Sequence, residues 1–175
     1  AALGRASGAP VTVRDLANRW DTDVIAEKPE TLCIMIGIND VWRQLDSPLR
    51  PDLGVGPDEY RKTLSQLVAA AKPHIQTLHL ATPYFIEPNR NDALRARMDE
   101  YGTIVREIAA MMNIPIRELA GYEADDGIGT LTKRATAEGV DTMIVSGDLD
   151  GLQLVDDHVR LLTTRMGVAA TVIYD

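Results

Sequence analysis

Carboxylate side chains gather in two short stretches late in the chain, "GYEADDGIGTL" and "SGDLD". The residues concerned are Glu123, Asp125, Asp126, Asp148 and Asp150. Carboxylate oxygens are the ligands that hard divalent cations such as Mg²⁺, Mn²⁺ and Ca²⁺ prefer. The pattern therefore indicates a cation site. The alternative is a first helical turn enriched in acids, which the helix dipole favours, followed by a solvated loop.

The charge balance supports an acidic late region. The 175 residues carry 18 Lys and Arg against 26 Asp and Glu, a net charge of −8, and residues 111–175 carry 5 against 11. A negative chain of this kind is not expected to bind nucleic acid through a general surface.

No apolar run approaches the roughly 20 residues of a membrane span, and no secretory leader is recognisable. We therefore expect no membrane and no obligatory partner, and a cytoplasmic location in a recombinant host. The single Cys33 lies in an apolar run, which predicts a buried thiol.

Strand and helix patterns alternate along the chain, so the acids must be positioned by an α/β fold. Apolar runs predict strands at 31–36, 76–82, 114–118, 142–146 and 159–164, and a further strand at "ATVIYD". Helical spacing of apolar residues predicts helices at 12–26, 60–71, 94–112 and 124–139. Thr12 and Asp15 fit a capping box for the first helix. Short connections of this kind are typical of a mostly parallel sheet with helices on both faces.

The first part of the chain, roughly residues 1–110, resembles the SGNH (GDSL-type) hydrolases. The resemblance rests on "IMIGIND", "LATPY" and the helix "EPNRNDALRARMDEYGTIVREIA", in this order. It implies that Gly37 and Asn39 belong to an oxyanion-binding block, with the Asn39 amide donating to an ester oxyanion. Strand-to-helix capping and turn chemistry is the other interpretation of Asn39 and Asp40.

Two parts of an SGNH site are missing from the pattern. The family's Gly-Asp-Ser block and its Asp-x-x-His block have no counterpart here, and His74, His79 and His158 show no ligand spacing. Nucleophilic hydrolysis needs a nucleophile in contact with a base. We therefore expect no esterase activity and assign the histidines surface or strand-face roles.

The second part, roughly residues 111–175, resembles the 5′-nuclease (PIN-like) domain of bacterial DNA polymerase I. The resemblance runs from "NIPIRELAGYEADDG" through "DTMIVSGDLDGLQL" to "ATVIYD". It implies that the five late carboxylates are remnants of a site for divalent metals used in phosphodiester hydrolysis. The family's first-strand aspartate, basic arch and DNA-gripping helices are absent, so a surviving site would be weak and would take Mg²⁺ or Mn²⁺.

Neither family contains the other's half, and both have a helix leading into a short strand near "IVREIAAMMNIPI". We interpret the chain as an engineered chimera forming one composite domain over residues 1–175, with a natural recombinant as the alternative. Counting 31–36 as strand 1, the expected Rossmann-like three-layer sandwich has about five strands in the order 3-2-1-4-5. This order places 142–146 beside 31–36, so that Asp40 could replace the missing first-strand aspartate at the metal site.

Three function classes follow. The first is a folded chimera with no intact active site, no required cofactor and no physiological activity. The second is a residual metal-binding protein with weak phosphodiesterase or 5′-nuclease activity, since two-metal chemistry needs clustered carboxylates and access for substrate. The third, an SGNH-type esterase, lacks both nucleophile and base.

Overall fold

The computed structural model describes residues 12–46, 49–83, 87–89, 91–116, 124–147, 149–164 and 171–175. Within these ranges five strands form one sheet in the order β2-β1-β3-β4-β5. They are β1 (Thr31–Met35), β2 (Thr77–Ala81), β3 (Thr142–Ser146), β4 (Val159–Thr164) and β5 (Thr171–Tyr174). All neighbouring pairs are parallel except β4 and β5, which are antiparallel. The expected α/β class with a mostly parallel sheet is confirmed.

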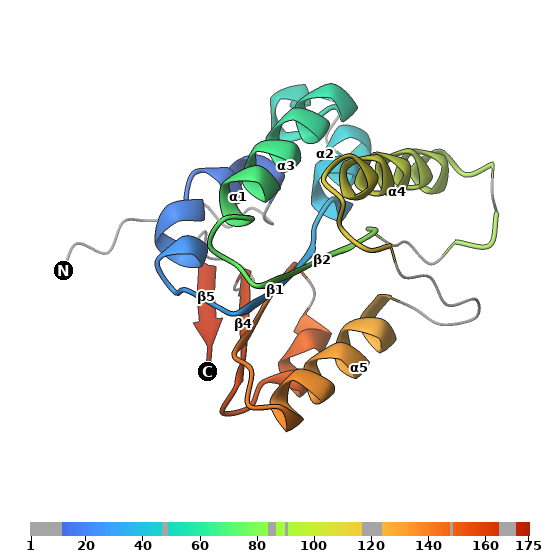
Figure 1. Ribbon diagram of the computed structural model, residues 1–175. Coiled ribbons are helices and arrows are strands. Elements are labelled where there is room, and N and C mark those ends of the chain that lie inside the picture. The colour runs from blue at the N-terminus through green and yellow to red at the C-terminus, as the bar shows by residue number, and fades with distance from the viewer. Residues whose placement is uncertain are drawn as a thin grey trace.

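Helices cover both faces of the sheet. They are α1 (Val13–Ala17), α2 (Ile38–Asp46), α3 (Pro57–Ala71), α4 (Ala93–Met111) and α5 (Ala124–Ala137), with shorter helical turns η1 (Asp21–Ile25), η2 (Pro51–Leu53) and η3 (Leu149–Leu154). Figure 1 shows α1, α3 and α4 on one side of the strands and α5 on the other. This is the three-layer arrangement expected from the sequence. No helix in the described ranges is both long and apolar enough to cross a bilayer.

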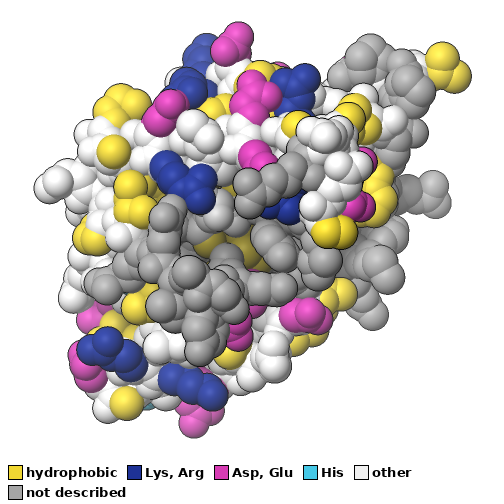
Figure 2. Space-filling model, turned by 90° about the vertical axis from the view of Figure 1, so that its right-hand side faces the viewer, with side chains coloured by type: hydrophobic (Ala, Val, Ile, Leu, Met, Phe, Trp, Pro, Cys, Tyr) yellow, Lys and Arg dark blue, Asp and Glu magenta, His cyan; other side chains and the backbone are white. Residues whose placement is uncertain are grey.

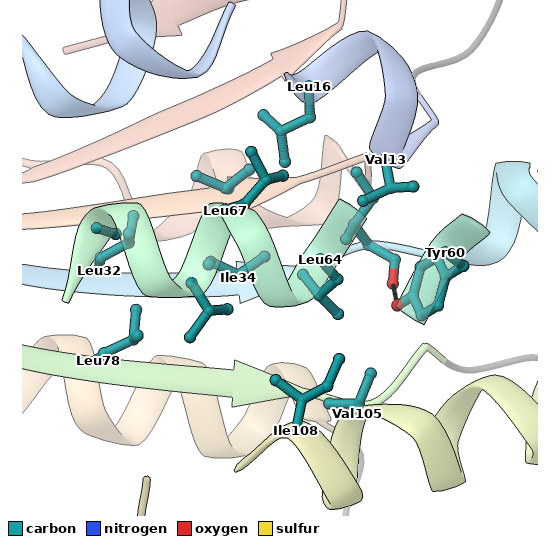
Figure 3. Close-up of a cluster of buried hydrophobic side chains, with 14 of the residues drawn as sticks. Val13, Leu16, Leu32, Ile34, Tyr60, Leu64, Leu67, Leu78, Val105 and Ile108 are labelled. Atoms are coloured by element: carbon teal, nitrogen blue, oxygen red, sulfur yellow. Dashed lines mark hydrogen bonds between the residues drawn. The ribbon is translucent and has the colours of Figure 1, made fainter. Parts of the chain in front are cut away.

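The alternation of side chains along β1 divides the core into two layers. Leu32 and Ile34 point toward α3 and α4, as Figure 3 shows, and belong to the larger hydrophobic cluster. Cys33 points to the opposite face, where it is buried beside Ile128 of α5 and Ile144 of β3. Successive residues of a strand face opposite sides of the sheet, so β1 must be apolar throughout when both sides are covered. The predicted buried thiol is confirmed.

The first predicted helix is divided into two pieces. The Thr12 side chain accepts a hydrogen bond from the Asp15 backbone N–H, and Asp15 reaches back to the Thr12 backbone, which confirms the capping box. The α-helix ends at Ala17, and the chain then makes the separate π-helical turn η1. Val13 and Leu16 are buried in the larger cluster, so α1 adds to the core on the face of the sheet that α3 and α4 cover.

The predicted sheet order is correct for four strands. β1 pairs in parallel with β2 on one side and with β3 on the other, from Thr31 opposite Thr142 to Met35 opposite Ser146. β4 follows β3, as predicted for 159–164. The adjacency of 142–146 to 31–36, on which the predicted order depended, is confirmed.

The predicted edge strand at 114–118 is wrong for the residues that can be assessed. Ile114, Pro115 and Ile116 form no strand, and 117–118 lie outside the described ranges. Pro115 has no N–H to give to a ladder. Asn113 takes a left-handed φ of 56°, and the Ile114 N–H then donates to the Ala109 carbonyl, which caps α4. The fifth strand is β5, on the opposite edge of the sheet.

Candidate functional site at the carboxyl ends of the strands

Gly37 makes the turn that carries the chain out of β1. Its φ of +138° is one that residues with a side chain rarely adopt. A Cβ atom there would lie 3.0 Å from the Pro83 ring and 3.1 Å from the Tyr60 hydroxyl. Glycine is therefore required at this position, because the loop after β2 and the first turn of α3 approach the backbone closely.

Asn39 lies in the first turn of α2 and is partly buried. Its Nδ2 atom lies 3.4 Å from the position that a Cβ atom would occupy at Gly147. Gly147 directly follows β3, so the two sequence blocks that carry the resemblances meet beyond the ends of neighbouring parallel strands. This is the neighbourhood that the predicted strand order required, and it is where α/β proteins bind ligands.

Asp40 is not on this surface. Its side chain is completely buried, and Oδ1 accepts a hydrogen bond of 2.9 Å from the Val13 backbone N–H. Burial raises the pKa of the Asp40 carboxyl to about 7. Hydrogen bonds from the backbone N–H groups of Val13 and of Asp40 itself act in the opposite direction and lower this pKa. The expectation that Asp40 stands in for a nuclease aspartate is corrected, because this carboxyl anchors α1 from inside the protein.

The late carboxylates are only partly available for description. Asp125 and Asp126 lie in the first turn of α5, and Asp150 lies exposed in η3. Glu123 and Asp148 lie outside the described residues. Among the residues that are described, no three His, Cys, Asp or Glu side chains form a group that could hold a metal ion. The described carboxylates alone therefore do not make up a divalent-cation site.

His158 lies at the opposite end of the strands from Asn39. His158 precedes β4, and its Nδ1 is 3.0 Å from an Asp141 carboxylate oxygen at the amino ends of β3 and β4. His74 is exposed in the turn after α3, and His79 is partly buried within β2. Since β1, β3 and β4 are parallel and a strand rises about 3.3 Å per residue, roughly 15 Å of sheet separates His158 from the Asn39 end.

A partly buried polar network lies beside Asp40, and no pattern in the sequence predicts it. The two N–H groups of Gln44 Nε2 are shared among three acceptors, which are the Asp40 carbonyl at 2.9 Å, the Val55 carbonyl at 2.7 Å and the Tyr101 hydroxyl at 2.9 Å. The Tyr101 hydroxyl also donates to the Val55 carbonyl. Tyr101 lies within the predicted helix 94–112, but the spacing of apolar residues along a helix does not reveal hydroxyl partners.

Figure 2 faces the side of the molecule on which β2 ends. It shows a depression with hydrophobic side chains at its floor, and both basic and acidic side chains occur around it. No single sign of charge dominates the described side chains on this face. The described side chains of this face therefore do not form the basic stripe typical of a nucleic-acid surface.

The family model for the 5'-3' exonuclease N-terminal, resolvase-like domain matches residues 88–175, half of the chain. Over these residues the chain belongs to that family. The match begins before the expected join at about residue 110, so α4 lies within it. We refer to residues 88–175 as the exonuclease-family segment.

Curated relatives fall into two groups that match different segments of the chain. The acetylxylan esterase of Geobacillus stearothermophilus is 51% identical over 102 residues, which are 58% of this chain and 47% of the esterase. DNA polymerase I of Chloroflexus aurantiacus is 48% identical over 73 residues, which are 41% of this chain and 8% of the polymerase. The chain thus spans about half of the esterase's length and a small part of the polymerase's.

Solved structures agree with the first group. The crystal structure of the Geobacillus esterase superposes with a TM-score of 0.58 at 50% identity, covering 59% of this chain and 48% of the esterase. An alpha/beta hydrolase from the metagenome of Lake Arreo superposes with the same TM-score at 56% identity and the same coverage. The esterase resemblance is therefore one of fold as well as sequence, and it overlaps the exonuclease-family segment, because 102 and 88 matched residues exceed the 175 of the chain.

Proposed function

We propose that the protein is an engineered chimera of an esterase-like part and the exonuclease-family segment, folded as one α/β domain without the activity of either parent. The observation that carries this proposal is the separation of Asn39 from His158 by the length of the sheet. The chain's partial coverage of both groups of relatives supports a recombined origin. The expected location is the cytoplasm of a recombinant host.

Ester hydrolysis would need more than Asn39. An amide can stabilise a developing oxyanion, which is worth two to three orders of magnitude in known sites, but it forms no bond to the substrate. A nucleophile and a base in contact must accompany it. His158 is hydrogen-bonded to Asp141 at the other end of the strands, so it cannot serve as a base beside Asn39 without a large rearrangement.

The test is hydrolysis of p-nitrophenyl acetate by the purified chain and by Asn39→Ala. We expect both to match the background rate of a non-enzymatic protein of similar lysine and histidine content. Turnover above this background that persists through successive purification steps and disappears in Asn39→Ala would contradict the proposal.

A weak divalent-cation site is the second candidate, favoured by the contact between Asn39 and the loop that begins at Gly147. Its donors would be the late carboxylates without Asp40, which is buried elsewhere. A cation at a hundred times its dissociation constant would add about 2.7 kcal/mol to the free energy of unfolding. Nuclease activity is expected to be absent or marginal, because a net charge of −8 repels nucleic acid.

Thermal melting decides between the two candidates. The chain and the double variant Asp148→Asn/Asp150→Asn are melted with and without millimolar Mg²⁺ or Mn²⁺ at fixed ionic strength. A rise in melting temperature with the cation in the parent alone supports the second candidate. An unchanged melting temperature in all conditions supports a chimera without a working metal site.

A further inference from the structure

Helix α1 is attached to the rest of the protein by an apolar face, by the Arg14–Glu59 ion pair at the surface and by a buried hydrogen bond between Val13 and Asp40. Val13 and Leu16 point from α1 toward α3, as Figure 3 shows, and both are buried. The N–H of Val13 is one of the amides that the start of a helix leaves without a partner inside the helix. The Asp40 Oδ1 atom of α2 accepts it at 2.9 Å.

The other oxygen of Asp40 has a different environment. Oδ2 is fully buried and has no hydrogen-bond partner within the described part of the chain. A buried carboxylate with only one oxygen satisfied is costly, whereas a neutral carboxyl is much less so. Detachment of α1 would give water access to the carboxyl and remove this cost.

The charged groups around Asp40 have opposing effects on its carboxyl. Arg14 of α1 makes two 2.8 Å contacts with the Glu59 carboxylate, and its positive charge lowers the pKa of Asp40 without a hydrogen bond to it. Asp15 of α1 adds a repulsive negative charge. Tyr60 of α3 donates its hydroxyl to the Ile36 carbonyl, and Tyr101 of α4 donates to a carbonyl of the loop before α3.

We propose that Asp40 and the start of α1 form a proton-linked latch, in which detachment of α1 from α2 and α3 is coupled to the loss of the Asp40 proton. The closed form favours the neutral carboxyl, because the Oδ2 atom of Asp40 is buried there and has no hydrogen-bond partner among the described residues. The open form favours the hydrated carboxylate. The proposal is independent of any catalytic or metal site in the chain.

The direction of the effect follows from linkage. Burial in the closed form raises the pKa of Asp40 to about 7, while a hydrated aspartate titrates near 3.9. Between these values the closed form holds a proton that the open form has released, so opening becomes easier as pH rises. Above about pH 7 both forms are ionised and the dependence ends.

Hydrogen exchange read by mass spectrometry or NMR tests the latch. Protection factors, corrected for the intrinsic exchange rate, are followed for the α1 amides Leu16 and Asn18 from about pH 5 to 8.5. We expect protection to fall about tenfold for each pH unit up to about pH 7 and then to level off. We also expect lower protection for α1 than for β3 at every pH, because the opening is local.

Two variants make the test specific. Asp40→Asn keeps an acceptor for the Val13 N–H but cannot ionise, so α1 protection should no longer depend on pH. Asp15→Asn removes the neighbouring negative charge but keeps an acceptor for the Thr12 N–H, so the slope should remain. A variant with His74, His79 and His158 all changed to Asn should keep the slope as well.

Three results would overturn the latch, and none depends on Asp40→Asn folding well. The parent could show no slope below pH 7, or α1 and β3 could have equal protection throughout, which would mean that α1 opens only in global unfolding. A slope that disappears in the histidine variant would assign the proton to another group.

Discussion

Gly37 occupies a position where the backbone conformation and the surrounding atoms both exclude a side chain. We predict that Gly37→Ala lowers the free energy of unfolding by roughly 1–3 kcal/mol, because alanine at φ +138° is strained and its methyl group would overlap Pro83. Gly127 in α5 is the matched control, since a Cβ atom there meets nothing within 4 Å. Gly127→Ala should stabilise by about 0.5–1 kcal/mol. Urea denaturation measures both, and equal effects of one sign would contradict the prediction.

His158 supplies a pH dependence of known sign. Its hydrogen bond with Asp141 raises the pKa of the imidazole above its ordinary value. A raised pKa means that the stabilising contribution is fully present at low pH and is lost as pH rises through the folded-state pKa. We predict that His158→Asn lowers the melting temperature at about pH 5 and has little effect at about pH 8.5. The exposed His74→Asn is the control, and a loss that is larger at high pH would refute the assignment.

The site residues differ in how far the sequence alone could predict them. The meeting of Asn39 with the loop after β3 follows from strand order, which hydrophobic patterns and crossover handedness predict. The burial of Asp40 does not, because it depends on where α1 packs against α2. An acid next to an asparagine after a strand looks the same in sequence whether it faces solvent or the core.

Helices and strands also differ in how far the sequence alone predicts them. Strong periodicity predicted α3, α4 and α5 and the four parallel strands, and Gly139 at φ +70° follows α5 as expected of a helix stop. The apolar residues of 114–118 favour a strand, yet Ile114 is buried because it closes the end of α4. The antiparallel direction of β5 depends on pairing with β4, which no local pattern encodes.

Two tyrosines join helices to the backbone beneath them. Tyr60 of α3 and Tyr101 of α4 have ring centroids 4.5 Å apart, and the Tyr60 hydroxyl donates to the Ile36 carbonyl at 2.7 Å. We predict that Tyr60→Phe lowers the free energy of unfolding by about 1–3 kcal/mol, because that carbonyl loses its hydroxyl donor in the core. Tyr174→Phe in the half-buried β5 is the control, with an expected loss below about 1 kcal/mol. Chemical denaturation that finds no difference between the two would contradict this.

At the scale of the molecule, contacts between the two parts predict a single unfolding unit. β1 and β3 pair along their whole length, and Glu30 accepts hydrogen bonds from Gln76 and from the Asp141 backbone. Arg160 of β4 contacts Glu27 at 2.5 Å. We expect one calorimetric transition of roughly 120 kcal/mol near 60 °C, with equal calorimetric and van't Hoff enthalpies. Two resolved transitions would mean that the parts unfold separately.

The pairing of β1 with β3 also has a consequence for synthesis of the chain. Glu30 and Asp141, at the start of this pairing, are 111 residues apart, and the two strands meet at the centre of the sheet. Contacts between distant residues form late, because closing a long loop costs entropy before any contact compensates for it. On a ribosome, β1 and β2 would emerge well before β3, leaving Cys33 and its apolar face uncovered. Between the synthesis of β2, which ends at Ala81, and that of β3, which begins at Thr142, the nascent chain would therefore hold a two-stranded sheet with an exposed apolar face, a state prone to aggregation.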